Sequence, residues 1–163
     1  MKKELAKTYE SKKVESRIYR LWEKSGFFNP DKLPKRHKIP FSMVLPPPNV
    51  TGTLHMGSAL MLIIKDIIIR FKRMRGKKTL WLPGTDHASI ATETKFLKEN
   101  NIRKSDYAEK RDEFIRLVDK FARQNQRTII KQLRAMGSSL DWSRLRYTLD
   151  KKRSNAVQEA FIR

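Results

Sequence analysis

Residues 41–76 read FSMVLPPPNVTGTLHMGSALMLIIKDIIIRFKRMRG: a short apolar run, a loop rich in proline and glycine, then a longer apolar run. The first run, residues 41–45, has the length of a buried strand. The second, residues 59–71, contains Lys65 and Asp66, is too short to span a bilayer and predicts a helix packed on a sheet. A second short strand is expected at residues 79–82. Strand, loop, helix and strand over about forty residues predict a βαβ unit with parallel strands.

Further helices are predicted on both sides of this unit. Apolar residues recur at helical spacing over residues 12–26, 90–100 and 106–136, the last being one long helix or two abutting ones. An extended piece follows, and a final helix starts at about Asp150. The chain stops within that helical pattern, which suggests a truncated product. The expected class is α/β, with parallel strands preceded by an N-terminal helix.

The composition narrows the range of functions. The 163 residues include 37 Lys and Arg against 17 Asp and Glu, a net charge of +20 that favours a polyanionic partner or describes a solvated basic surface. Without cysteine there are no disulfides, thiolate zinc sites or cysteine nucleophiles, and a cytoplasmic location is expected. The start of the chain has no apolar signal-peptide core, and the histidines show no metal-ligand spacing.

The proline-rich loop has the features of a phosphate site. Its prolines hold the backbone extended, while Gly52 and Gly57 allow close approach. The following helix is expected to start near Gly57 and Ser58, with unpaired N–H groups at the carboxyl edge of a parallel strand. His55, just before it, could donate a hydrogen bond to a phosphate oxygen. The alternative is an ordinary strand-to-helix turn with a surface histidine.

A second loop, PGTDHAS, follows the second strand and carries Asp86 and His87. Adjacent parallel strands would bring it next to the first loop. Asp86 could bind an ammonium group or cap the next helix. A basic cluster over residues 70–78 could contact nucleic acid or form a solvated helix end.

Several stretches together resemble class I aminoacyl-tRNA synthetases. The loop PPPNVTGTLHMGSAL (46–60) resembles their first signature, the HIGH motif, in its valine-specific form. The stretch WLPGTDHASIATE (81–93) is similar to the second conserved block of the valyl-tRNA synthetases. IYRLWEKSGFF (18–28) and GSSLDWSRLRYTLD (137–150) resemble further family segments in the right order. The Pro-Asn-Val-Thr-Gly and Gly-Thr-Asp-His-Ala runs separate the chain from the isoleucyl and leucyl relatives.

The resemblance implies a Rossmann-type catalytic domain that joins valine to ATP and passes the aminoacyl group to tRNA(Val), with Mg2+ arriving on ATP. It implies that His55, Gly57 and Ser58 contact ATP, with His55 and Ser58 in catalytic positions. It places valine and its adenylate against Pro46, Pro47 and Asn49, and the valine ammonium group on Asp86. It also implies a division into an N-terminal helix and linker (1–38) and the first part of the catalytic domain (39–163), up to the editing insertion.

The chain departs from the family pattern in several places. Ser58 replaces the second histidine of the motif, Ser89 stands where Gly or Ala is usual, and Glu93 stands where Gln is usual. The KMSKS signature, the editing insertion and the anticodon-binding region are missing. These departures predict that residues 1–163 alone are inactive. They leave open a non-catalytic, synthetase-like module that binds nucleotide or RNA.

Overall fold

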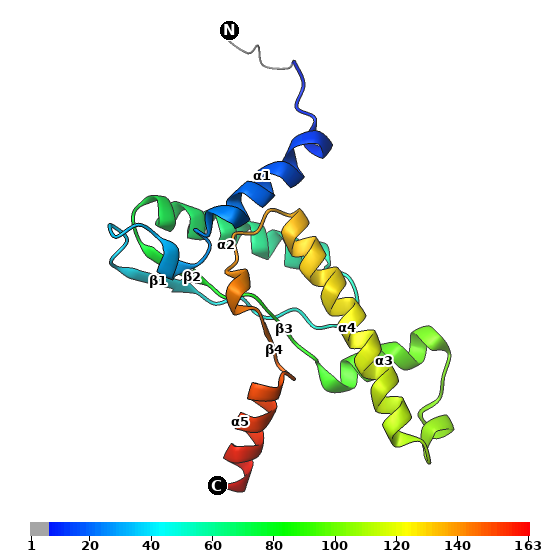
Figure 1. Ribbon diagram of the computed structural model, residues 1–163. Helices are drawn as coiled ribbons and strands as arrows, with labels where there is room; N and C mark the ends of the chain where they lie inside the picture. The colour runs from blue at the N-terminus through cyan, green and yellow to red at the C-terminus, as the bar shows by residue number, and fades with distance from the viewer. Residues whose placement is uncertain (1–6) are drawn as a thin grey trace.

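Figure 1 shows the computed structural model, which describes residues 7–163. The helices are α1 (Ser11–Ser25), α2 (Met56–Met74), α3 (Ser89–Asn100), α4 (Arg111–Ala135) and α5 (Lys151–Ile162). The strands are β1 (Pro40–Met43), β2 (Lys78–Trp81), β3 (Gly84–Thr85) and β4 (Arg146–Tyr147). α1 and α5 project from opposite ends of the molecule (Figure 1).

The strands are parallel, as the sequence predicts. β1 pairs with β2, with Phe41 opposite Thr79, and β3 pairs with β4. Pro83 interrupts the middle strand between β2 and β3, and its carbonyl accepts a hydrogen bond from the Arg146 amide at 3.1 Å. The α/β class is therefore confirmed. The pairing of β4 is additional, since the sequence predicts only an extended piece there.

One hydrophobic core joins the strands to α2 and α4. Trp81 of β2 is fully buried, as are Leu62 and Ile69 of α2 and Leu133 of α4. Leu62 and Ile69 are seven residues apart, which is about two helical turns, so both side chains lie on the same face of α2. The βαβ unit thus closes around a shared apolar interior.

α2 is less buried than its sequence predicts. Leu62 and Ile69 are covered, but Ile64, Ile67 and Phe71 are each at least half exposed. Leu62 and Ile69 belong to the core that α2 shares with the sheet and α4, whereas Ile67 lines an open groove beside α1. Apolarity all round a helix indicates what the helix can bury, and the neighbouring elements decide what it does bury.

α1 is tied to the end of α4 by a buried polar contact. The Tyr19 hydroxyl donates to the Ser138 carbonyl at 2.9 Å and accepts from the Trp142 indole N–H at 2.8 Å. Burial raises the pKa of Tyr19 to about 12. α1 ends at Gly26, whose φ of 74° places it in the left-handed region that glycine tolerates.

The basic cluster at the end of α2 is partly internal. Arg70 donates to Asp66 at 2.6 Å and to the Gly137 carbonyl at 2.6 Å. Arg73 donates to the Thr79 hydroxyl at 3.1 Å, and burial lowers its pKa to about 10. Arg70 and Arg73 therefore link α2 to Gly137 and to β2. Neither interpretation from the sequence, a nucleic-acid contact or a solvated helix end, describes these two arginines.

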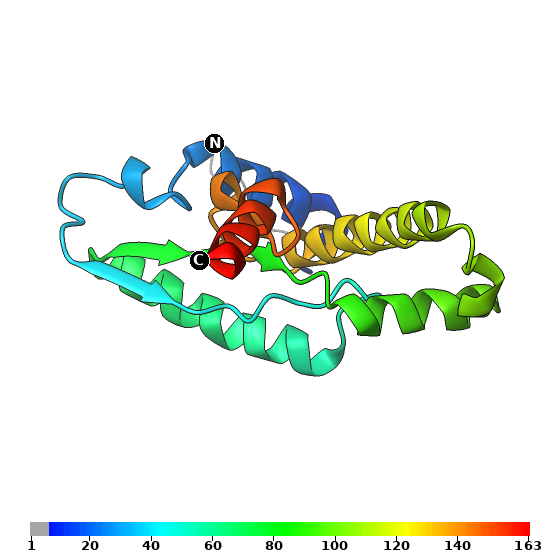
Figure 2. The same ribbon diagram turned by 90° about the horizontal axis from the view of Figure 1, so that it is seen from below.

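α4 is a single helix, which decides between the alternatives left by the sequence. It begins at Arg111, later than predicted, because a 3-10 turn (Lys104–Tyr107) precedes it. Figure 2 shows α3 lying along the N-terminal half of α4, and Phe96 packs edge-on against Phe114 and Phe121 there. The helical pair extends beyond the sheet edge where the loops meet.

Candidate functional site

The two loops and the end of β4 meet at one edge of the sheet. A parallel bridge joins Asn49 to Asp86: the Val50 amide donates to the Asp86 carbonyl at 2.9 Å, and the Asp86 amide donates to the Pro48 carbonyl at 2.8 Å. Beyond Asp86, Thr148 follows β4 directly. This edge contains the carboxyl ends of the parallel segments, where open α/β proteins place their ligands.

His55 is the N-cap of α2, which begins at Met56, slightly earlier than predicted. Its Nδ1 accepts a hydrogen bond from the Ser58 amide at 3.2 Å, and its Nε2 lies 3.1 Å from the Ser58 hydroxyl. Because Nδ1 accepts, the ring proton of a neutral imidazole is on Nε2, and it points to the Ser58 oxygen. His55 and Ser58 thus form a local pair on an exposed surface.

Gly57 makes room for this pair. A Cβ at Gly57 would lie 3.1 Å from both Cε1 and Nδ1 of the His55 ring, closer than most such contacts allow. Glycine therefore permits the imidazole to lie against the first turn of α2. The sequence indicates close approach at this position, but not that the approaching group is the neighbouring histidine.

Amide side chains of α4 hold the backbone of the first loop and the Thr85 side chain just before Asp86. Asn125 donates to the carbonyl of the buried Val50 at 3.0 Å, and Gln132 accepts from the Leu54 amide at 2.9 Å. Gln126 donates to the buried Thr85 hydroxyl at 2.8 Å, one residue before Asp86. These roles were missed in the sequence. The signal was polar Asn125 within the apolar pattern of residues 106–136.

Asp86 is held by contacts to one of its carboxylate oxygens. Oδ1 accepts from the Thr148 hydroxyl at 2.8 Å and from the Ala88 amide at 3.2 Å. Among residues 7–163, Oδ2 has no hydrogen-bond partner, and the side chain is 35% exposed. Ala88 is the N-cap of α3 and no side chain caps that helix, so the interpretation of Asp86 as its cap is wrong.

The other predicted residues line the same edge. Pro46, Pro47 and Asn49 are exposed, and Pro47 borders a cavity of about 360 Å3 together with Gly84 and Thr148. The Asn49–Asp86 bridge therefore brings together the predicted amino-acid contacts. His55 and Ser58 contact each other, and no hydrogen bond among the described residues joins them to Asp86.

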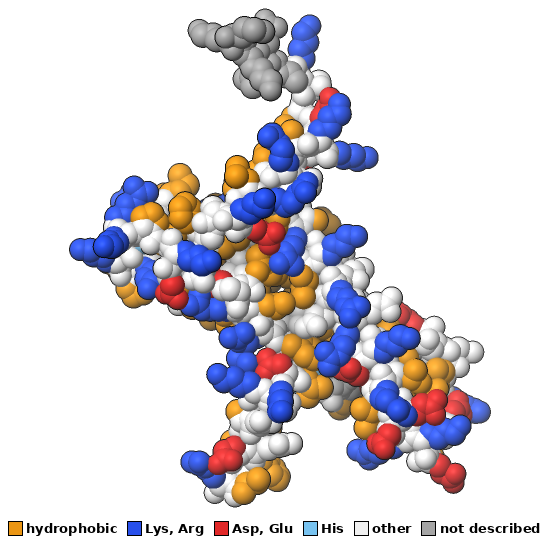
Figure 3. All heavy atoms as spheres, in the orientation of Figure 1, with side chains coloured by type: hydrophobic (Ala, Val, Ile, Leu, Met, Phe, Trp, Pro, Cys, Tyr) orange, Lys and Arg blue, Asp and Glu red, His pale blue; other side chains and the backbone are white. Residues whose placement is uncertain are grey.

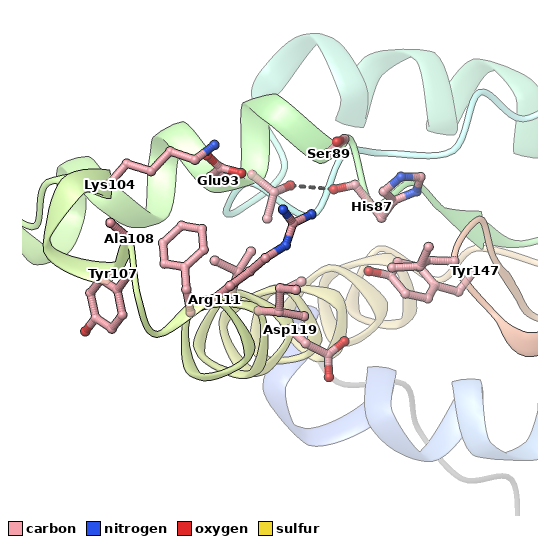
Figure 4. Close-up of a pocket in the computed structure, with 15 residues that line it drawn as sticks. His87, Ser89, Glu93, Lys104, Tyr107, Ala108, Arg111, Asp119 and Tyr147 are labelled. Carbon is pink, nitrogen blue, oxygen red and sulfur yellow. Dashed lines mark hydrogen bonds and ion pairs between the residues drawn. The ribbon is translucent and has the colours of Figure 1, made fainter. Parts of the chain in front are cut away.

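Two of the three residues that depart from the family pattern, Ser89 and Glu93, lie beside a second cavity. Figure 4 shows this cavity, of about 450 Å3, between α3 and α4, with His87 and Tyr147 at one end. Ser89 and Glu93 line it, and Glu93 pairs with Lys104 at 2.6 Å. Ser89 has a φ of 29°, in the left-handed region that disfavours a residue with a side chain. A glycine at this position would carry no such strain.

The charged surface of the molecule is mostly basic. Lys and Arg side chains are spread over the face in Figure 3, with fewer acidic ones between them. After Asp119, α4 contains no acidic residue. One turn before Asp119 and along the rest of the helix, α4 exposes five cationic side chains, Arg116, Lys120, Arg123, Arg127 and Lys131.

In residues 7–163, no group of three or more His, Cys, Asp or Glu side chains is placed to bind a metal ion. No helix within the same range is long and apolar enough to cross a membrane.

Comparison with known proteins gives a consistent result. Residues 17–163 match the family model described as tRNA synthetases class I (I, L, M and V). The chain is 49% identical to the mitochondrial valine–tRNA ligase 1 of Arabidopsis thaliana over 98% of its length, and 47% identical to that of Treponema denticola over 98%. It is 44% identical to that of Buchnera aphidicola (Schizaphis graminum) over 97%.

The chain spans only a small part of these relatives, between 14% and 18% of their length. Among solved structures, it is similar to the LeuRS of Agrobacterium radiobacter K84, crystallised as a ternary complex with tRNA and LeuAMS. The TM-score is 0.75 at 17% identity, over 95% of this chain and 18% of that one. This likeness shows a shared fold.

Proposed function

The chain belongs to the class I tRNA synthetases (I, L, M and V), and on that premise we propose that it is the N-terminal part of a valine–tRNA ligase. The whole protein would activate valine with ATP and transfer it to tRNA(Val). The observation that carries the proposal is the Asn49–Asp86 bridge, which joins the two family loops at one sheet edge. The division into an N-terminal helix and linker (1–38) and the first part of the catalytic domain (39–163) is part of the proposal.

In this proposal the second loop binds the amino acid. The free Oδ2 of Asp86 accepts a hydrogen bond from the valine ammonium group, a charge-assisted contact. Asn49, Pro46 and Pro47 form the neighbouring wall for valine and its adenylate. The rigid proline backbone limits the space beside Asp86.

The first loop binds ATP. The amides at the start of α2, near Gly57, and the positive end of the helix dipole attract phosphate oxygens. His55 donates a hydrogen bond from Nε2–H to the Ser58 oxygen, so the Ser58 hydroxyl proton is free to be donated to a phosphate. His55 and Ser58 then stabilise charge that develops on the phosphate during adenylate formation.

Mg2+ enters this proposal only as a partner of ATP. We assign it no ligand among residues 7–163, because no acidic or histidine cluster suits it there. What these residues do is position two reactants so that the valine carboxylate meets the α-phosphate.

A chimera tests the proposal. Residues 1–163 replace the matching segment of the Treponema denticola valine–tRNA ligase, and valine-dependent ATP–pyrophosphate exchange is measured. We expect exchange by the chimera, and none by residues 1–163 alone, which lack the KMSKS signature. No exchange by a folded chimera would contradict the proposal. Exchange by residues 1–163 alone, above a control without valine, would contradict the expectation that activity needs the segment with the KMSKS signature.

A second candidate is a non-catalytic module that binds RNA, favoured by the charge of +20 and the acid-free stretch of α4. Phosphate contacts from lysine and arginine give binding that weakens steeply with salt and reads little sequence. Equal affinity of residues 1–163 for tRNA(Val) and other tRNAs, without exchange by the chimera, would favour this candidate. A cytoplasmic location is expected under both, and cell fractionation tests it.

A further inference from the structure

Thr148 follows β4 directly, and its side chain connects the predicted amino-acid loop to that strand. Its amide donates to the Thr85 carbonyl at 3.2 Å, which fixes the residue beside β3. Its hydroxyl donates to Asp86 Oδ1 at 2.8 Å, although 62 residues separate the two in sequence. The same oxygen lies 2.9 Å from the His87 amide nitrogen and 2.6 Å from His87 Nδ1.

The hydrogens in this group can be counted. A threonine hydroxyl has one proton and two lone pairs. Its proton goes to Asp86, because an ionised carboxylate has no proton to give. Both contacts with His87 must therefore be donated by His87, one from the amide N–H and one from Nδ1–H. The hydroxyl is then fully used, and the Nε2 of a neutral His87 has a free lone pair.

We propose that Thr148 is a positioning residue for recognition of the substrate ammonium group, because it turns Asp86 Oδ2 outward and fixes His87 in the Nδ1–H tautomer. This inference rests on the proposed function, since it takes the ligand to be an α-amino acid. Thr148 itself does not touch the ligand. It acts through Asp86, whose Oδ1 it occupies, and through His87, whose ring it orients.

Two further contacts hold His87 in the same position. Tyr147 meets the imidazole edge-on, with ring centroids 6.4 Å apart. Thr92 of α3 donates to the His87 carbonyl at 2.6 Å, and Figure 4 draws this hydrogen bond as the dashed line that ends at His87. Tyr147 and Thr92 thus add to the contacts that Thr148 makes with the ring and the backbone amide of His87, and within residues 7–163 Thr148 is the one residue that forms hydrogen bonds with both His87 and Asp86.

The expected effect of losing the hydroxyl is moderate. Thr148 is exposed, so water competes for its partners, and one such hydrogen bond contributes about 1 kcal/mol. That corresponds to a fivefold to tenfold change in an equilibrium constant. Thr148→Val keeps the shape and β-branching and removes the hydroxyl, whereas Thr148→Ser keeps the hydroxyl.

The test uses residues 1–163 and 15N NMR of the His87 ring. Wild type and Thr148→Ser should show the Nδ1–H tautomer, and Thr148→Val should lose it. In titrations, L-valine should bind Thr148→Val fivefold to tenfold more weakly than wild type. Binding of 2-hydroxy-3-methylbutanoate, which has no ammonium group, should not change. Thr128→Val, a hydroxyl loss on α4 far from the loops in sequence, is the matched control and should behave as wild type.

The possible outcomes separate the two proposals. If Thr148→Val keeps the Nδ1–H tautomer and the affinity for valine, the positioning role is wrong. If Thr148→Val weakens the amine-free acid equally, Thr148 acts on general structure and the inference is also wrong. If wild type shows the Nδ1–H tautomer but no response to valine, the amino-acid site of the proposed function is wrong, while the tautomer assignment holds.

Discussion

The two loops of the candidate site both contact α4, but they differ in what holds the side chains of their predicted ligand-binding residues. In the first, side chains of α4 hold the backbone at Val50 and Leu54, while the side chains of His55 and Ser58 form hydrogen bonds, within residues 7–163, only between these two residues. In the second, the distant Thr148 holds the side chain of Asp86 directly. We infer that the first loop has a fixed backbone with adjustable side chains, and the second presents a carboxylate that is already oriented. In the proposed function the first loop contacts phosphates whose charge changes during the reaction, which suits adjustable side chains. The second loop binds an ammonium group whose charge stays constant, which suits a fixed carboxylate.

Asp86→Ala should have the largest effect. It leaves the substrate ammonium group without its charged partner, a loss of about 3 to 4 kcal/mol. In the chimera, kcat/KM for valine activation should fall about a hundredfold to a thousandfold. Asp119→Ala, a carboxylate on α4 that pairs with Arg123, is the control and should have little effect. A fall below tenfold would mean that the second loop does not bind the ammonium group.

Ser58→His should act on the first loop and in the opposite direction. An imidazole reaches further towards a phosphate than a hydroxyl does, and one donor of this kind is worth about a hundredfold to a thousandfold in turnover. Because His55 and the helix dipole remain, we expect the lower end. Single-turnover adenylate formation by the chimera should accelerate, with little change in valine affinity. An unchanged or slower rate would show that residue 58 does not face the phosphates.

Asn125→Ala tests whether α4 fixes the first loop. It leaves the carbonyl of the buried Val50 without its partner, which costs about 1 to 3 kcal/mol in the free energy of unfolding. Urea unfolding of residues 1–163 should show this loss. Hydrogen exchange should accelerate at residues 50–54 more than at residues 84–86. The exposed Gln124→Ala is the matched control, and equal acceleration of both loops would remove the distinction between them.

Ser89→Gly should stabilise the second loop. Ser89 has a φ of 29°, and the left-handed region costs a residue with a side chain about 1 to 2 kcal/mol. Glycine avoids this strain but loses more backbone entropy on folding. The net gain in unfolding free energy should be about 0.5 to 1 kcal/mol. Ser105→Gly, outside the loops, serves for comparison, and a loss of stability in Ser89→Gly would contradict the assigned strain.

Tyr147→Phe should have the smallest effect, confined to alkaline pH. Burial raises the pKa of Tyr147, with Asp119 and Asp86 adding to the effect against Arg123. The unfolded chain therefore ionises first, so the contribution of Tyr147 to stability is complete below its ordinary pKa and is lost as pH rises above about 10. Tyr147→Phe should reduce the loss of stability between about pH 8 and pH 11. The raised pKa of Tyr19 causes a loss of stability of the same sign, so the dependence of stability on pH should become weaker in Tyr147→Phe and not disappear. The exposed Tyr9→Phe is the control, and an equal slope in both variants would contradict the assignment.

Much of the fold follows from local patterns. The apolar runs of residues 41–45 and 79–82 predict β1 and β2, and the spacing between them predicts a parallel pair. The helices appear where apolar periodicity places them, because that pattern gives a helix one face to bury. The start of α4 and the exposure of α2 could not be predicted in the same way. They depend on a 3-10 turn and on which neighbours are present.

The candidate site divides along the same line. By itself the sequence determined which residues carry the family motifs, from Asn49 and His55 to Asp86, because a motif is a local pattern of residue types. Only the tertiary structure decided how they are held. In the sequence, Asn125 is a polar break in an apolar pattern, but in the fold it donates to the Val50 carbonyl. Thr148 looks like an ordinary surface residue, but in the fold it donates to Asp86. The physical reason is that a hydrogen bond depends on distance and direction between atoms, and neither is encoded in the spacing of residues that lie 62 or more positions apart.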